Sequence, residues 1–302
     1  MHYSLFEPLI PQTAKQVMCV EIYKGVANSL LAFSIGLVIL FINQFWDPFK
    51  RGFFCDDESI KYPFKNGTIP SSVLYGVGFS LNIASFIVIE AVMLRQFRTQ
   101  SSTSSRQQDT KRHLMHSYFC STFYVLLPFL FGAAVVQLIT DIAKYSIGRL
   151  RPHFLDVCKP DFTKFNCTDG YITADVCTGD SVLIQEARVS FPSGHASFSM
   201  YAMIFLVLYY QARLTCKRLF LLRPLLQLIV FCLAYYTGIS RIYDYKHHWS
   251  DVLVGDILGV IVAVISFYSL TDLFNNNRAK PVETKEKDGL DTVQATNPVT
   301  KL

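Results

Sequence analysis

The sequence predicts an all-α protein that crosses a membrane six times. Of its 302 residues, 51% are hydrophobic and only 17% are charged, and the mean hydropathy is +0.29. Soluble domains usually carry about 25% charged residues, so this composition excludes an ordinary soluble enzyme. Runs of about 20 apolar residues, the length needed to cross the hydrocarbon core of a bilayer, recur along the chain.

The apolar runs divide the chain into three parts. We expect a cytoplasmic N-terminal segment over 1–25, a six-span domain over 26–274 and a disordered cytoplasmic tail over 275–302. No small-residue cleavage site precedes the first run, so we expect that run to remain as an anchor. The predicted spans are Val26–Phe45, Ser72–Leu94, Tyr118–Asp141, Ala196–Gln211, Leu219–Ile239 and Val252–Phe274.

The charge pattern and the last residues indicate which partners the protein could bind. The net charge of +5 is spread along the chain and forms no basic stripe, so we expect no nucleic-acid partner. The membrane itself is the main expected partner, and the sequence is compatible with a homo-oligomer. The terminal Thr300–Leu302 would suit a domain that captures a C-terminal carboxylate.

Two sequons indicate which side of the membrane each loop faces. Asn66-Gly67-Thr68 and Asn166-Cys167-Thr168 fall in loops predicted on the same side, where glycosylation would require an extracellular or luminal location. Both termini would then be cytoplasmic. We expect a multi-pass protein of the plasma membrane, with the endoplasmic reticulum or Golgi as alternatives.

The same outer loops contain half of the eight cysteines. In an oxidising compartment four cysteines suggest two disulfides, and three pairings are open. Their spacing does not match that of a metal site. The four residues are Cys55, Cys158, Cys167 and Cys177.

A polar stretch, Ser240–Asp251, joins the fifth and sixth predicted spans. His247 stands four residues before Asp251, so the two side chains can meet if Asp251 lies on the first turn of the next helix. A carboxylate bonded to one ring nitrogen leaves the other nitrogen free to attack. Arg241, six residues before His247, supplies planar donors suited to phosphate oxygens. The ordinary alternative is a cluster that contacts lipid headgroups.

A second cluster follows the third predicted span. Lys144 and Arg151 are seven residues apart, about two helical turns, so both cations would face one way before Pro152 ends the helix. Taken alone, such a pair is more typical of a helix end anchored at the lipid headgroups.

A third cluster, Phe191–His195, directly precedes the fourth predicted span. Proline and glycine allow a tight turn whose free amides, near Ser193 and Gly194, can point at an anion. His195 can give or take a proton near neutral pH. The ordinary alternative is a serine helix cap followed by a surface histidine.

The order of the spans brings these clusters together. Two share one loop and the third follows two crossings later, so all three lie on the same face of the membrane. Together they supply three cations, free amides, two histidines and one aspartate, which suits a phosphate pocket with a nucleophile and an acid. Two acids within apolar runs, Glu90 and Asp256, remain outside this scheme; intramembrane acids are often functional, but either could face a polar neighbour.

The ordered set Lys-x6-Arg-Pro, Pro-Ser-Gly-His and Ser-Arg-x5-His-x3-Asp resembles the signature of the type 2 phosphatidic acid phosphatase superfamily. Within it, the chain from about residue 20 to 275 resembles the animal lipid phosphate phosphatases. The resemblance implies a haloperoxidase-like helical core with the site at the outer membrane boundary. It also implies hydrolysis of lipid phosphate monoesters such as phosphatidate, lysophosphatidate, sphingosine 1-phosphate and ceramide 1-phosphate.

The same resemblance implies a role for each site residue. His247 would be the nucleophile that forms a phosphohistidine, and Asp251 would orient it. His195 would protonate the leaving alkoxide and then activate water. Cations and amides would hold the phosphate, so we expect neither a metal nor another cofactor. The implied phosphate-binding residues are Lys144, Arg151, Ser193, Gly194 and Arg241.

Two other interpretations share these motifs. A related phosphatase of narrower substrate, acting on a sugar phosphate or a polyprenyl diphosphate, would use the same chemistry. A non-catalytic membrane scaffold is typical of relatives that lose the nucleophile or the acid, whereas this chain has both His247 and His195. Release of phosphate from lipid and soluble substrates distinguishes the three.

Overall fold

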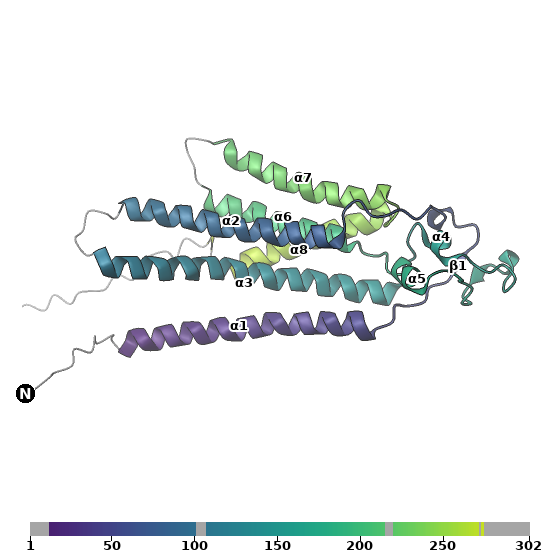
Figure 1. Cartoon of the computed structure of the whole chain (residues 1–302), viewed down its shortest axis with the longest axis horizontal. Coiled ribbons are helices and arrows are strands. Elements are labelled where there is room, and N and C mark those ends of the chain that lie inside the picture. The colour runs from purple at the N-terminus through teal and green to yellow at the C-terminus, as the bar shows by residue number, and fades with distance from the viewer. Residues whose placement is uncertain (1–11, 101–106, 215–219, 272, 275–302) are drawn as a thin grey trace, which may run out of the picture.

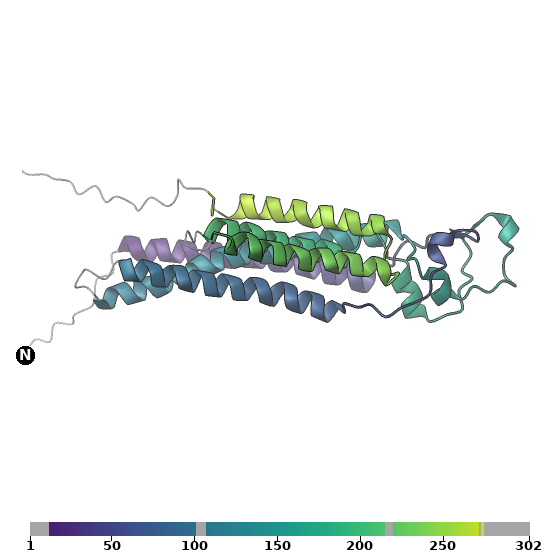
Figure 2. The same cartoon turned by 90° about the horizontal axis from the view of Figure 1, so that it is seen from above.

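The fold is a bundle of long helices with a small folded region beyond one end. The structure, a computed structural model, describes residues 12–100, 107–214, 220–271, 273 and 274. The long helices lie side by side along the longest axis (Figure 1 and Figure 2). They are α1 Gln12–Phe45, α2 Ser71–Gln100, α3 Gln107–Ile147, α6 Gly194–Arg213, α7 Leu222–Tyr243 and α8 Trp249–Leu270.

Among the described residues, five helices are long and apolar enough to cross a membrane, namely α1, α2, α3, α7 and α8. The helix missing from this set, α6, corresponds to the fourth predicted span. It packs against α2, α3, α7 and α8, and most of its side chains are buried. A helix enclosed by protein meets little lipid, so its serines and tyrosines can face neighbouring helices. The chain is a mostly helical, polytopic membrane protein.

The third helix ends earlier than predicted. It stops at Ile147 rather than at Pro152, because Gly148 adopts a left-handed φ of +57°. A Cβ at Gly148 would lie 2.0 Å from the carbonyl oxygen of Phe49, so only glycine fits this turn. The expectation that Lys144 and Arg151 share one helix face is therefore wrong, since Arg151 lies beyond the helix.

Close packing of α8 on α6 fixes the position of the site. A Cβ at Gly255 would lie 2.7 Å from the Ser193 carbonyl oxygen, and one at Gly259 would lie 2.5 Å from that of Ser197. Two glycines four residues apart thus let the two backbones touch, as small residues do between membrane helices. This contact brings the first turn of α8 against the first turn of α6.

The region beyond the helices is a compact cap. It contains α4 Phe154–Cys158, α5 Ser181–Ala187 and two 3₁₀ helices, Glu58–Ile60 and Cys167–Asp169. It also contains a two-stranded antiparallel sheet, β1 Phe53–Phe54 and β2 Tyr171–Ile172, in which Phe53 pairs with Ile172. The sequence did not predict these strands.

Two disulfides link the segments of the cap. Cys55 is bonded to Cys167 and Cys158 to Cys177, which selects one of the three pairings that the sequence left open. The cap also has its own hydrophobic core, formed around Phe154. Since the cap joins the loop after α1 to the loop after α3, it connects segments more than 100 residues apart.

A buried ion pair lies toward the other end of the bundle. Glu90 of α2 is 2.9 Å from Nε of Arg213 and accepts hydrogen bonds from Ser121 and Tyr209. These contacts join α2, α3 and α6, so the polar-neighbour interpretation of Glu90 holds. The predicted N-terminal segment is partly helical, since α1 begins at Gln12. Residues 1–11, the tail 275–302 and its terminal Thr300–Leu302 lie outside the described residues.

Candidate active site

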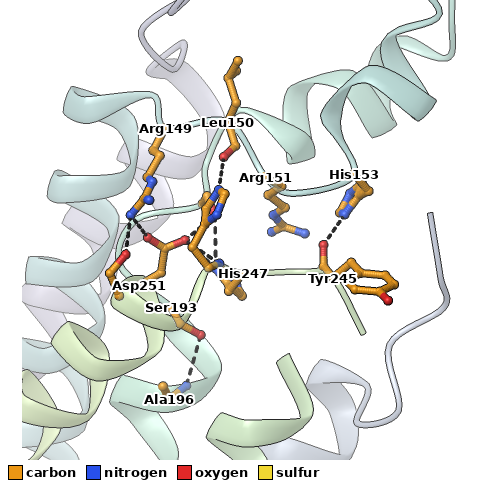
Figure 3. A network of polar contacts seen from close by, with 12 residues as sticks. Arg149, Leu150, Arg151, His153, Ser193, Ala196, Tyr245, His247 and Asp251 are labelled. Atoms are coloured by element: carbon orange, nitrogen blue, oxygen red, sulfur yellow. Dashed lines mark hydrogen bonds and ion pairs between the residues drawn. The ribbon is translucent and has the colours of Figure 1, made fainter. Parts of the chain in front are cut away.

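The three predicted clusters meet where the cap joins the bundle. The second cluster spans the last turn of α3 and the residues after it, the third spans the start of α6, and His247 lies in the turn between α7 and α8. Figure 3 shows Arg149, Arg151, His247 and Asp251 arranged around one space, with Ser193 beside them. The clusters thus lie together at one end of the helix bundle, as their order along the chain predicted.

His247 and Asp251 lie close together as predicted. The Nδ1 atom of His247 is 3.7 Å from Oδ2 of Asp251, and both side chains are buried. Asp251 lies in the first turn of α8, where the helix dipole favours a negative charge. Among the described residues, none forms a hydrogen bond with the other ring nitrogen of His247. That nitrogen, Nε2, is the atom available for a reaction.

Ser190 stands between the histidine and the carboxylate. Its hydroxyl donates a hydrogen bond to Oδ2 of Asp251 at 2.6 Å, and its Oγ lies 3.5 Å from Nδ1 of His247. Ser190 itself is fully buried. No sequence pattern marks this serine, because it lies 61 positions from Asp251 in the chain.

Arg149 is the cation that the sequence analysis missed. Its guanidinium donates to the Asp251 carboxylate and, at 2.8 Å, to the hydroxyl of Ser250. A buried carboxylate needs a charged or hydrogen-bonded partner, and Arg149 supplies both. The one sequence feature that could have indicated Arg149 is its place between Lys144 and Arg151.

The two adjacent histidines have different surroundings. The Nε2 atom of His248 contacts the Leu150 carbonyl oxygen at 3.0 Å, and its backbone amide donates to Asp251. The ring of His248 is therefore held away from the space that His247 faces. This geometry supports the choice of His247 over His248 that the motif spacing implied.

Arg151 is buried and is only partly paired. Its Nη1 donates to Glu186 at 2.9 Å, whereas its buried Nε has no hydrogen-bond partner among the described residues. Burial alone would raise the pKa of the Glu186 carboxyl, but the Arg151 charge lowers that pKa below its ordinary value. Glu186 thus holds one side of the guanidinium and leaves other donors free for an anion.

Lys144 lies beside the first turn of α6. A Cβ at Gly194 would be 3.0 Å from the Nζ atom of Lys144. Within the described part of the chain, the ammonium group forms no ion pair and no hydrogen bond. The first amides of α6 face the same place, since helix N-termini present unpaired N–H groups.

Ser193 contributes differently from the sequence-based expectation. Its amide donates to the carbonyl oxygen of Asp251 at 3.0 Å, and its hydroxyl caps the amide of Ala196. The ordinary interpretation, a serine helix cap, describes this residue correctly. The Ser193 amide is therefore already paired, and Gly194 and His195 supply the free amides of the turn.

Arg241 lies at the end of α7 with its side chain buried. Its Nη2 donates to Asp244 at 3.0 Å and its Nε to Ser240 at 3.0 Å. The loop before α2 closes over it, since a Cβ at Gly67 would be 2.9 Å from Nη1 of Arg241. The same loop reaches His195, whose Nε2 contacts the Ile69 carbonyl oxygen at 3.1 Å.

The electrostatic environment keeps the imidazole of His247 neutral. Burial lowers the pKa of His247 to about 3; the Asp251 carboxylate opposes this effect, and the Arg151 and Lys144 charges add to it. A neutral imidazole has a lone pair on one nitrogen, so His247 is in the form that a nucleophile needs. In the described ranges, no three His, Cys, Asp or Glu side chains gather as a metal site would require.

Comparison with known proteins assigns the family. A family profile described as the PAP2 superfamily matches residues 125–275. Phospholipid phosphatase 1 of Rattus norvegicus is 43% identical over 291 residues, which cover 96% of this chain and 95% of that protein. The chain belongs to the PAP2 superfamily.

Other relatives of this PAP2 protein agree. Phospholipid phosphatase 2 of Mus musculus is 43% identical over 79% of this chain and 83% of its own length. A putative phosphatidate phosphatase of Drosophila melanogaster is 38% identical over 89% of this chain and 73% of its own. No solved structure gave a significant match. The region matched by the PAP2 profile contains all the predicted catalytic and phosphate-binding residues.

Three remaining residues lie away from this PAP2 site or at its edge. Asp256 lies near α7, since a Cβ at Gly238 would be 3.5 Å from its Oδ2, and its Oδ1 has no hydrogen-bond partner among the described residues. The side chains of Asn66 and Asn166 are both exposed on the cap side. These two sequons are therefore accessible in the folded protein. In the described part of the chain, no hydrogen bond or ion pair joins Asp256 to a site residue.

Proposed function

We infer that this PAP2 protein is a phospholipid phosphatase, an integral-membrane hydrolase that releases phosphate from lipid phosphate monoesters. One observation carries the inference: a chain 43% identical to a phospholipid phosphatase over 96% of its length brings His247, Asp251 and several cations together. The substrates that we propose are phosphatidate, lysophosphatidate, sphingosine 1-phosphate and ceramide 1-phosphate.

The first chemical step is transfer of the phosphoryl group to His247. The lone pair on Nε2 of His247 attacks phosphorus, the bond from phosphorus to the lipid oxygen breaks, and a phosphohistidine forms. His195 gives its proton to the departing alkoxide, which leaves as a neutral lipid alcohol. Asp251, held by Ser190 and Arg149, stabilises the positive charge that develops on the His247 ring.

The second step is hydrolysis of the phosphohistidine. His195, now neutral, takes a proton from a water molecule as that water attacks phosphorus. The bond from phosphorus to Nε2 breaks, which releases inorganic phosphate and returns His247 to its neutral form. Proton transfers to and from a positioned histidine typically contribute about 10²- to 10⁴-fold in rate.

Positive charges and free amides hold the phosphoryl oxygens in both steps. Lys144 has no competing partner among the described residues, Arg151 has an unpaired Nε, and Arg241 presents the part of its guanidinium that Asp244 leaves free. The amides of Gly194 and His195 complete the cage. Preorganised charge of this kind is a large contribution to phosphoryl transfer.

We propose a six-span arrangement in which α6 is the fourth crossing and the cap faces the extracellular or luminal side. The domain division 26–274, cytoplasmic termini and plasma-membrane residence remain part of this proposal. Its support is the pair of exposed sequons and the two cap disulfides, which are typical of an oxidising compartment.

Phosphate release from a panel of substrates tests the proposed function. Purified protein in detergent should release phosphate from the four lipid phosphates but not from glucose 6-phosphate or a polyprenyl diphosphate. Because cations and amides hold the phosphate, EDTA should leave this activity unchanged. Release only from a non-lipid substrate, restoration of activity by Mg²⁺ after EDTA, or no release at all would contradict the proposal.

A further inference from the structure

A segment of the first outer loop crosses the proposed site. We call residues 61–70, between the first 3₁₀ helix and α2, the strap. The ring of Tyr62 stacks on Tyr245 with centroids 4.6 Å apart, and the ring of Phe64 meets His153 edge-on at 5.2 Å. The strap also bonds the second cluster, since the amide of Tyr62 donates to the carbonyl oxygen of Pro152 at 2.9 Å. It therefore contacts Tyr245 of the first cluster, Pro152 of the second and the adjacent His153.

Thr68 forms the most specific contact of the strap. Its backbone amide donates to Oδ2 of Asp244 at 2.7 Å, and its hydroxyl donates to Oδ1 of the same carboxylate at 2.9 Å. Two hydrogen bonds from one residue to both oxygens fix the plane of a carboxylate. The orientation of the Asp244 carboxylate is thus set by the strap as well as by α7.

Asp244 passes this orientation on to Arg241. Its Oδ2 accepts from Nη2 of Arg241 at 3.0 Å, and both side chains are buried, with 3% exposure for Arg241 and 4% for Asp244. The contact at Gly67 closes the other side of the same guanidinium. A guanidinium held on two sides keeps its remaining donors pointed in one direction.

The strap also reaches the proposed general acid. The residue after Thr68 is Ile69, whose carbonyl oxygen lies 3.1 Å from Nε2 of His195. A carbonyl oxygen can only accept, so this contact keeps a proton on Nε2 and leaves Nδ1 as the nitrogen that exchanges protons. Two consecutive strap residues therefore contact the site: Thr68 binds the partner of a proposed phosphate-binding cation, and Ile69 binds the proposed acid itself.

We propose that Thr68 is a positioning residue for the phosphatase reaction, acting through Asp244 to aim Arg241 at the phosphoryl group. This inference rests on the proposed function of Arg241. Because Thr68 is also the third residue of a sequon, it has a second explanation, namely that it serves only for attachment of a glycan to Asn66. Glycan attachment requires both Asn66 and Thr68, whereas positioning of Arg241 requires only Thr68.

Three substitutions separate these explanations. Asn66→Gln removes the sequon and leaves both hydrogen bonds of Thr68 in place. Thr68→Ser keeps the sequon and the hydroxyl. Thr68→Val keeps the shape of the side chain and removes the sequon and the hydroxyl together. Glycan occupancy is followed by the mass shift on glycosidase treatment, and folding by the unfolding temperature in detergent.

We expect Thr68→Val to reduce kcat/KM for phosphatidate about 10- to 100-fold, the usual effect of losing a hydrogen bond to a buried charge. Its inhibition constant for inorganic phosphate should rise about 10-fold, since the product uses the same guanidinium. Asn66→Gln should keep wild-type values, and Thr68→Ser should keep most of the activity. Equal losses in Asn66→Gln and Thr68→Val, or wild-type phosphate affinity in Thr68→Val, would overturn the proposal.

A second variant addresses the other side of the guanidinium. Gly67→Ala places a methyl group 2.9 Å from Nη1 of Arg241, closer than normal packing allows, so that flexible side chain must shift. This change keeps the sequon, so weaker phosphate inhibition with an intact glycan supports the proposal and unchanged inhibition opposes it. Binding of inorganic phosphate, measured as the rise in unfolding temperature, tests the strap even if the wild type proves inactive on lipids. Inactivity of the wild type on lipid phosphates would contradict the proposed function but not the role of Thr68 in phosphate binding.

Discussion

The Nδ1 atom of His247 lies 3.7 Å from Oδ2 of Asp251, with the hydroxyl of Ser190 bonded to the same carboxylate oxygen. The distance exceeds that of a direct hydrogen bond, so Ser190 is part of the contact between the imidazole and the carboxylate. The position of His247, the proposed nucleophile, thus depends on three segments of the chain: the turn before α8, the first turn of α8 and the turn before α6.

Arg149 should be needed for activity although no motif pointed to it. Arg149→Ala leaves the buried Asp251 carboxylate without its cation, so we expect a loss of roughly 1–3 kcal/mol in unfolding free energy and at least about 10-fold in kcat/KM. Arg149→Lys should recover only part of the activity, because one ammonium cannot reproduce the planar donors that reach both Asp251 and Ser250.

Arg188 offers a matched control for Arg149. It is also an arginine of the cap region, but it bonds the Arg51 carbonyl oxygen and packs on the ring of Phe154. Arg188→Ala should reduce stability while retaining kcat/KM within about 2-fold of the wild type. The proposed role of Arg149 would be disproved if Arg149→Ala and Arg188→Ala lost the same fraction of kcat/KM for the same loss in the free energy of unfolding.

Acid should destabilise the protein through His153. Burial lowers the pKa of His153 to about 4, against an ordinary value of 6.5, and the Arg151 and Lys246 charges contribute. The unfolded chain therefore takes up the proton first as the pH falls. The contribution of His153 to the free energy of unfolding is complete above about pH 6.5 and is lost as the pH falls toward 4.

The test compares unfolding temperatures between pH 7.5 and pH 4 for the wild type and His153→Asn. The asparagine amide can still donate to the Tyr245 carbonyl oxygen that now contacts Nδ1 of His153. It cannot be protonated in this range, so its unfolding temperature should fall less steeply with acid. Identical slopes would mean that His153 does not titrate as its burial indicates.

The proposed orientation predicts glycosylation of Asn166. Protein made in a eukaryotic secretory membrane should lose mass on glycosidase treatment, and Asn166→Gln should remove part of that loss. In the structure the Asn166 side chain is exposed and its Oδ1 only caps the amide of Thr168. A tag after Leu302 that protease reaches only from outside the cell would show that the site faces the cytosol instead.

The sequence could predict the helices and the composition of the site because both depend on local patterns. Apolar runs determine the long helices, and the i, i+4 spacing of His247 and Asp251 survives in the turn before α8. α6 is not apolar enough to be recognised as a spanning helix from its composition. Its packing explains why, since its polar side chains face other helices instead of lipid. That cause is not visible in the segment itself.

Contacts between distant residues could not be predicted in this way. Ser190 and Arg149 reach Asp251 across 61 and 102 positions, and no local pattern marks such pairs. The disulfide pairing and the small sheet depend on the same long-range folding of the cap. Gly148 lies within the Lys-x6-Arg-Pro motif, but only the position of Phe49 shows why its left-handed turn ends α3 early.

The two histidines are proposed to act differently: His247 attacks phosphorus, and His195 gives and takes protons. A nitrophenolate departs without protonation, so His195→Ala should still be phosphorylated by nitrophenyl phosphate. It lacks the base that activates water, and the phosphoenzyme should accumulate after one turnover. His247→Ala has no nucleophile and should show neither step with any substrate.

The most direct measurement is a rapid-mixing experiment on His195→Ala with nitrophenyl phosphate labelled at phosphorus. We expect a burst of nitrophenol equal to the enzyme concentration, with acid-labile label retained on the protein. His247→Ala, under the same conditions, should give no burst and no label. A burst from His247→Ala, or label that resists acid, would contradict the assignment of His247 as the nucleophile.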